Sequence, residues 1–318
     1  MVIMEILDWP DIPFWKDLVS RDATSTFYHT PLWHEIVVKT FKNYRNASKG
    51  FVFSDGTRAV FPFIQVKPGG FWGGSRRLKS SICGGYGGII SDRILSAEQQ
   101  AHIYNYITSI KASIAIECNP FAAYTLPDPF SRKRDFVHFI ALEKGEDSVY
   151  KKLSRGAKRS LNRADEKGVV VRRIQTQDEL KSYFKVYRSN LKRWGDATRV
   201  TFPEKLFKTM LHNGGDAVKI WVAEKEHKVI AVLTLVYWNG MVHGFHAAAL
   251  KEYFDCCPNN ILHMEAIRDA IKNNYRYYDF GASGEMEGVI RFKESMGAER
   301  REFTAGHWKF RGAKKRIS

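Results

Sequence analysis

With 318 residues, of which 44% are apolar and 14% aromatic, the chain is long enough for two domains of about 150 residues each, and its composition excludes a disordered or fibrous protein. The formal net charge of +16 predicts an anionic partner, such as tRNA, a CoA or nucleotide-linked substrate, or an anionic membrane surface. The first fifteen residues lack the pattern of a secretory signal, and the most apolar stretch, 229–238, is half of the ~20 residues that a membrane span needs. We therefore expect a cytoplasmic protein without a transmembrane segment.

The first half is expected to contain helices followed by several strands. The helices are predicted at 11–21, 31–42 and 96–110, and the strands at 50–53, 58–66, 113–118 and 136–142. Paired glycines between residues 69 and 88 predict turns, and prolines mark the loop before the last of these strands.

The second half is expected to open with one long helix over 146–167 that connects two domains, 1–145 and 146–318. It continues with a strand at 169–174, helices at 177–194 and 203–212, strands at 218–224, 229–238 and 241–249, a helix from 259 or 260 to 273, and strands at 275–280 and 302–310. Asn239-Gly240 predicts a two-residue hairpin turn. Both halves share the order of helices, meander, helix and strand, which indicates duplication of one α/β (α+β) unit.

The predicted connecting helix carries a row of cations. Lys151, Arg155, Arg159, Arg163 and Lys167 recur every four residues, and Lys152 and Lys158 widen the row. The opposite side is apolar, so the helix is expected to pack one face and to present the cations on the other. A solvated charged face explains such a row as well, but its few acids come only at the end, which favours contact with phosphate or tRNA.

Two later segments have the residues of an anion site and a reaction site. Pro258-Asn259-Asn260 opens a helix after a buried strand pair, and the free N–H groups of a helix start suit a phosphate or an oxyanion. As a plain helix cap the same residues need no function.

The segment 277–297 places Phe292 and Lys293 after a strand that ends in Asp279-Phe280-Gly281. Attack of an amine on an ester or thioester builds negative charge on the carbonyl oxygen, which a fixed ammonium stabilises. The alternative is an ordinary turn in which Lys293 pairs with an acid.

Other site types are excluded by spacing. The four cysteines, Cys83, Cys118, Cys256 and Cys257, fit neither a disulfide framework nor a zinc site, and we expect reduced thiols and no metal. His243 and His246 are three residues apart on a predicted strand and should face opposite sides. No nucleophile elbow, kinase set or dinucleotide-binding glycine pattern is present.

The order of several modest motifs resembles the FemABX family of aminoacyltransferases and the related FemAB-like (BioF2-like) branch of the GNAT superfamily. The matching segments are 28–33, 151–169, Phe202-Pro203 with Leu206-Phe207, Pro258-Asn259-Asn260, 278–281, and Gly288 with Phe292-Lys293 and Gly297.

The resemblance implies two tandem GNAT-like domains with mixed, mostly antiparallel sheets, and amide-forming transfer of an acyl or aminoacyl group to an amine. It implies that Lys293, with Phe292 beside it, stabilises the tetrahedral intermediate. The expected substrate-binding residues are Trp33, Lys39, Lys151, Arg155, Lys158, Arg159, Arg163, Asn259, Asn260, Asp279 and Gly281.

Departures from the family pattern keep the substrates open. Phe202 stands where members acting on peptidoglycan precursors have an arginine, Lys39 is slightly out of register, and the usual pyrophosphate loop of acetyltransferases is absent between 249 and 260. We expect no tightly bound cofactor, with aminoacyl-tRNA or acyl-CoA as co-substrate, in cell-wall or envelope biosynthesis. The alternatives are acyl-CoA-dependent N-acylation of a small amine or amino sugar, and a non-catalytic nucleic-acid-binding protein.

Overall fold

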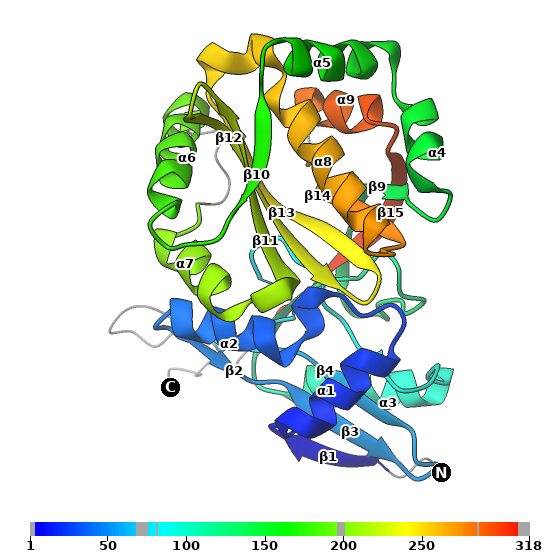
Figure 1. Ribbon diagram of the computed structural model, residues 1–318. Coiled ribbons are helices and arrows are strands. Elements are labelled where there is room, and N and C mark those ends of the chain that lie inside the picture. The colour runs from blue at the N-terminus through cyan, green and yellow to red at the C-terminus, as the bar shows by residue number, and fades with distance from the viewer. Residues whose placement is uncertain (1–3, 68–75, 81, 196–200, 285, 311–318) are drawn as a thin grey trace. The chain divides into compact units, whose positions relative to one another are not determined.

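The computed structural model describes residues 4–67, 76–80, 82–195, 201–284 and 286–310 (Figure 1). Its contacts divide the chain into two units, one made of Met1–Asp135 with Glu302–Ser318 and the other of Phe136–Arg301. The structure thus differs from the predicted boundary between 145 and 146, because the division falls inside two strands, β9 (Ser131–Ala141) and β15 (Glu299–Trp308).

Unit 1 has two sheets and a core of aromatic and branched side chains. One sheet has the order β1 (Met4–Asp8), β3 (Lys49–Phe53), β4 (Arg58–Phe61) and β7 (Ile90–Ser91). In the other, β15 pairs with β8 (Ser113–Glu117), followed by β6 (Arg77–Lys79), β5 (Ile64–Val66) and β2 (Tyr44–Asn46). The helices of this unit are α1 (Ile12–Arg21), α2 (Pro31–Thr40) and α3 (Ala97–Ser109).

Unit 2 contains a sheet with the strand order β10 (Val170–Ile174), β11 (Val218–Lys225), β12 (Lys228–Trp238), β13 (Met241–Ala249), β14 (Tyr277–Ala282) and β9. Helix α8 (Pro258–Lys272) packs on this sheet, and α5 (Arg155–Glu166) packs against α8; α6 (Leu180–Trp194) and α7 (Glu204–Asn213) also contact the strands of the sheet (Figure 1). Two short elements precede α8 and β15, namely the 3-10 helix Lys251–Cys256 and the helix α9 (Glu287–Ser295).

Each unit contains one parallel strand pair, and a helix lies between the paired strands in the sequence. In unit 1 the pair is β6 and β8 with α3 between them, and in unit 2 it is β13 and β14 with α8 between them. The other described ladders are antiparallel. The predicted mixed, mostly antiparallel sheets are therefore confirmed.

The prediction of one continuous helix over 146–167 is wrong. The segment forms α4 (Gly145–Lys152) and α5, which are separated at Leu153 and Ser154. Ser154 has an extended backbone, its side chain accepts a hydrogen bond from the Ala157 N–H, and its own N–H donates to the Ser295 carbonyl. A serine that caps a new helix in this way competes with helix continuation.

Candidate functional site

Lys293 is held on α9 by two backbone carbonyls of β14. The residue is only 5% exposed, and its Nζ donates hydrogen bonds to the Gly281 oxygen at 2.7 Å and the Ala282 oxygen at 3.1 Å. Because a buried ammonium has to be hydrogen-bonded, these carbonyls fix where the charge lies. The structure thus gives Lys293 two backbone partners, where the turn alternative supposed an acid.

A bulge in β14 turns these carbonyls toward Lys293. The pairing of β14 with β9 shifts register between Asp279 and Ala282, and Gly281 has a φ of +72°. The Gly281 N–H donates to the Asp279 carboxylate at 2.7 Å. A bulge of this kind bends the strand and redirects its groups, and glycine adopts the left-handed backbone without strain.

The strands β13 and β14 part next to this bulge. Their parallel pairing runs from Met241 and Tyr277 to His243 and Asp279, where the His243 Nδ1 lies 2.9 Å from the carboxylate. Beyond it β13 stays paired with β12 as far as Ala249, and the described pairings of β14 are with β9. The carbonyls that hold Lys293 therefore belong to the part of β14 beyond its last pair with β13.

Two buried histidines lie near the Lys293 charge. Burial lowers the pKa of His263 to about 3, and burial also lowers the pKa of His138, with the Lys293 ammonium as a further cause at both. His263 is hydrogen-bonded through Nδ1 to the Tyr278 hydroxyl at 2.7 Å. Both imidazoles are consequently neutral near pH 7 and add no further positive charge beside Lys293.

Phe292 is half-buried and packs in the core. Its ring centroid lies 5.4 Å from that of His263 and 6.5 Å from that of Phe280. This packing anchors α9, so Phe292 positions its neighbour Lys293 through the helix.

The start of α8 is a helix N-terminus that follows the 3-10 helix Lys251–Cys256. Cys257 precedes Pro258 with a φ of +50°, and the first turn contains Asn259 and Asn260. The Asn259 Oδ1 is buried without a hydrogen-bond partner among the described residues, and the Asn260 Nδ2 contacts the Met296 sulfur at 3.6 Å.

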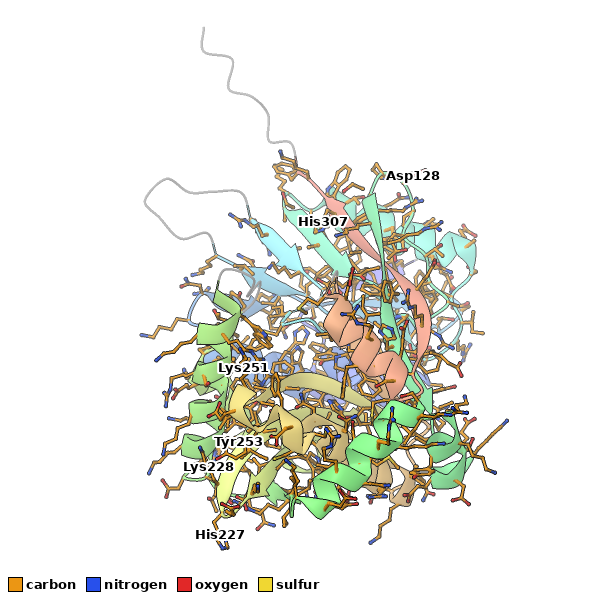
Figure 2. All side chains as sticks on the ribbon, turned by 90° about the horizontal axis from the view of Figure 1, so that it is seen from above. Asp128, His227, Lys228, Lys251, Tyr253 and His307 are labelled. Carbon is orange, nitrogen blue, oxygen red and sulfur yellow. The ribbon has the colours of Figure 1, made fainter. Side chains whose placement is uncertain are left out.

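Two lysines lie at the 3-10 helix Lys251–Cys256 that precedes α8. Lys228 donates to the Tyr253 hydroxyl at 3.2 Å, and Lys251 opens the 3-10 helix that leads into α8. Figure 2 shows these three residues along one edge of unit 2. Pro258 has no N–H and the Asn260 N–H donates to the Cys257 carbonyl at 3.1 Å, so attraction for an anion here would come from the lysines and the helix dipole.

The predicted basic row is only partly available for binding. Arg155, Arg159 and Arg163, here called the α5 arginine row, are exposed and unpaired with acids within the described ranges, and Lys151 is exposed at the end of α4. Lys158 lies over the Tyr150 ring at 5.1 Å. The row is neutralised at two positions by acids distant in sequence, which the local pattern could not reveal. Lys152 pairs with Glu299 at 2.7 Å and Lys167 pairs with Asp255.

Two of the expected substrate-binding residues, Trp33 and Lys39, belong to unit 1, where one is buried and the other exposed. Trp33 is 2% exposed on α2 and packs against Phe27 and Tyr28, which makes it a core residue of that unit. Lys39 lies one and a half turns further along the same helix, exposed, in an ion pair with Glu35 at 2.5 Å.

The prediction that His243 and His246 face opposite sides is wrong. His243 is opposite Val236 and His246 is opposite Thr234, so the register shift in β13 leaves Phe245 as the extra residue. Since Val236 and Thr234 are two residues apart on β12, both histidines lie on one face of the sheet. The sequence contains no pattern that would have located this bulge.

In the described ranges we find neither a reactive thiol nor a metal-binding cluster in addition to the Lys293 site. All four cysteines are free, and burial raises the pKa of Cys83 and Cys118 to about 12, so both remain protonated. No group of three or more His, Cys, Asp or Glu side chains there could hold a metal ion. No described helix is long and apolar enough to cross a bilayer.

Comparison with known proteins supports the fold and the resemblance. A family model described as an acetyltransferase (GNAT) domain matches residues 151–294. The crystal structure of FemX matches with a TM-score of 0.69 at 13% identity, over 94% of this chain and 96% of that chain.

Two further structures are similar over almost the whole chain. The C-terminal domain of a putative lysylphosphatidylglycerol synthetase from Agrobacterium fabrum has a TM-score of 0.61 at 14% identity, over 95% of this chain and 92% of that one. A tandem GNAT protein from the clavulanic acid biosynthesis pathway has a TM-score of 0.55 at 10% identity, over 99% of this chain and 100% of that one. No curated protein sequence matches the chain. The two units therefore have GNAT-like folds.

Proposed function

We propose that this chain, which shares the fold of FemX, transfers an acyl or aminoacyl group from an activated carboxyl donor to an amine. The observation that carries the proposal is the buried ammonium of Lys293, held by the Gly281 and Ala282 carbonyls beside the point where β13 and β14 part. A fixed cation in a site with little water stabilises negative charge that develops on a carbonyl oxygen far better than a solvated one does.

The reaction forms one bond and breaks one. The amine nitrogen attacks the carbonyl carbon, the oxygen becomes negatively charged next to Lys293, and the carbonyl re-forms as the bond to the leaving oxygen or sulfur breaks. The proton lost by the amine leaves with the released alcohol or thiol. The chain's own contribution is to hold the ammonium in place before the reaction begins.

The donor is proposed to be anionic. The α5 arginine row suits the phosphates of tRNA, whereas the start of α8 with Lys228 and Lys251 suits the compact phosphates of CoA. The likeness to FemX and to a putative lysylphosphatidylglycerol synthetase favours aminoacyl-tRNA as donor and an envelope component as acceptor. An acyl-CoA donor with a small amine or amino sugar is the alternative.

The test compares Lys293→Met with Lys219→Met. Lys219 is a matched control because its side chain is 10% exposed and paired with Asp269 at 2.6 Å in the same unit. Radiolabelled aminoacyl-tRNA and acetyl-CoA are offered with amino-sugar and lysyl-peptide acceptors, and the amide product is identified by mass spectrometry.

We expect Lys293→Met to lose about 10²- to 10³-fold in turnover, as on removal of an oxyanion donor, while Lys219→Met retains turnover. Thermal stabilisation by uncharged tRNA or by CoA then identifies the donor class. Normal turnover by Lys293→Met, with its fold intact, would refute the role of the lysine.

A further inference from the structure

A hydrogen-bonded chain of three side chains, Thr234, Tyr183 and the partly buried His246, lies on the face of the unit 2 sheet that carries His243 and His246. The Thr234 Oγ1 is 2.9 Å from the Tyr183 hydroxyl, which is 2.5 Å from the His246 Nδ1. Thr234 and Tyr183 are completely buried. None of the three belongs to the catalytic arrangement around Lys293 described above.

The Nε2 of His246 is buried without a partner among the described residues. Leaving a buried polar group unpaired costs about 1–3 kcal/mol. An unpaired group of this kind in a folded protein calls for an explanation, such as a bound ligand or water. The position of its hydrogen decides which ligand could satisfy it.

The chain of contacts indicates which nitrogen carries the proton. If Thr234 donates to Tyr183 and Tyr183 donates to Nδ1, both hydroxyl protons are used and the imidazole proton lies on Nε2. In the reverse order Nδ1–H donates to Tyr183 and Tyr183 donates to Thr234. The Thr234 hydroxyl proton then has no acceptor in the described structure, and the Nε2 lone pair has no donor. The first order leaves fewer buried groups unsatisfied and is therefore favoured.

The surroundings of His246 keep it uncharged. Its ring centroid lies 4.5 Å from that of Tyr187, 5.4 Å from that of Phe207 and 6.2 Å from that of Phe202. Burial lowers the pKa of His246 to about 3. The imidazole is thus neutral at physiological pH, and its Nε2–H is a neutral donor among aromatic rings.

One ring of this enclosure is less buried than the others. Phe202 is half-buried, its ring centroid lies 4.9 Å from that of Phe245 in a tilted arrangement, and its N–H donates to the Tyr187 hydroxyl at 2.8 Å. A ligand that reaches Nε2 is expected to displace this side chain, because the other rings are packed in the interior.

We propose that His246 marks a binding site for an uncharged substrate group that joins an apolar body to a hydrogen-bond-accepting oxygen, such as an amide or ester carbonyl. Nε2–H donates to that oxygen, and the aromatic rings contact the apolar body. A carboxylate or ammonium is disfavoured, because the described aromatic rings around His246 would strip it of water and carry no opposite charge. This site goes beyond the proposed transfer reaction and does not depend on the role of Lys293.

The first experiment is NMR of the whole protein labelled with ¹⁵N-histidine, which distinguishes the two tautomers. We expect His246 to be protonated on Nε2, and Tyr183→Phe to shift the proton toward Nδ1 by removing its donor. The probes are phenylacetamide, with an aromatic ring and a neutral carbonyl, and phenylacetate, its charged counterpart. Phenylacetamide should move the Nε2 signal and bind at least 10-fold more tightly than phenylacetate.

His263 is the internal control, since its Nδ1 also bonds to a tyrosine hydroxyl and its pKa is also lowered to about 3 by burial. Its signal should stay in place as phenylacetamide binds, whereas His246→Leu should weaken that binding about 3- to 10-fold, the worth of one neutral hydrogen bond.

The proposal is overturned by a His246 proton on Nδ1, by an Nε2 signal that phenylacetamide leaves unchanged (a bound water only), or by equal shifts at His263. If His246→Leu prevents folding, Tyr183→Phe tests the same proposal through its effect on which His246 nitrogen carries the proton. In the transfer assay, a raised KM for donor or for acceptor in Tyr183→Phe shows which substrate carries the oxygen. Loss of transfer in Lys293→Met with an unchanged His246 signal separates the two proposals.

Discussion

Gly281 lies where backbone strain and the placement of Lys293 depend on one another. Its φ of +72° is a conformation that residues with a side chain rarely adopt, and an added Cβ would lie 3.4 Å from the His243 Cε1 and 3.5 Å from the Gly244 oxygen. The left-handed backbone alone costs a residue with a side chain about 1–2 kcal/mol, and the added Cβ would meet His243 and Gly244 at ordinary van der Waals distances. We therefore expect Gly281→Ala to lower the free energy of unfolding by about 1–2 kcal/mol, out of the 5–15 kcal/mol of a typical domain.

The same substitution should reduce transfer. The Gly281 carbonyl accepts a hydrogen bond from the Lys293 Nζ at 2.7 Å, so a backbone that relaxes away from the left-handed region moves the ammonium. A displacement of 1 Å in a positioned group can cost about 100-fold in rate. Urea unfolding followed by circular dichroism measures the first effect, and single-turnover transfer measures the second.

Gly288→Ala is the matched control. Gly288 lies in α9 with no atom within 4 Å of an added Cβ, so alanine there should leave stability equal or raise it by up to about 1 kcal/mol. Equal unfolding midpoints for the two variants would refute the strain described at Gly281. A destabilised Gly281→Ala with full transfer activity would refute the link to Lys293.

Three further outcomes are expected. Ser154→Ala removes the side-chain cap of α5 and should lower the free energy of unfolding by about 1 kcal/mol, measured by urea titration; an unchanged midpoint contradicts the account of the break between α4 and α5. The pKa of Glu179 is lowered to about 2, chiefly by the hydrogen bond from the Gln175 N–H, so its stabilisation is present above the ordinary value of 4.5 and is lost as the pH falls toward 2. Glu179→Gln should therefore flatten the loss of stability in that pH range, and parallel acid titrations would contradict this. Replacing the α5 arginine row with alanine should reduce the slope of log K against log salt for tRNA by about 2–3, whereas the same change at Lys181, Lys185 and Lys192 of α6 should not; equal changes would exclude α5 as the tRNA site.

Local patterns predicted much of unit 2. The meander formed by β11, β12 and β13 and the helix α8 lie within a few residues of the predicted ranges. Asn239 and Gly240 both have positive φ values, as a two-residue hairpin turn requires. These elements depend on neighbours in sequence, which is why the sequence alone predicts them.

Features that depend on distant partners were not predicted. The break at Ser154 is stabilised by the Ser295 carbonyl, and the neutralisation of Lys152 comes from Glu299, each more than a hundred residues away in sequence. The bulge at Phe245 depends on the pairing of β13 with β12. For the candidate site, the sequence indicated Lys293 and its chemistry, but neither the carbonyls that hold it nor the helix α9 that presents it.

The assignment of Glu302 and the residues after it to unit 1 bears on how the protein is synthesised. β8 pairs with β15 from Glu117 opposite Ala305 to Ile114 opposite Trp308, so an edge of unit 1 finds its partner only after unit 2 has been translated. At 5–20 residues per second the nascent chain waits on the order of ten seconds or more with that edge open. An unpaired edge invites association with other chains. We therefore expect a ribosome-bound chain arrested before β15 to depend on chaperones more than the finished protein does.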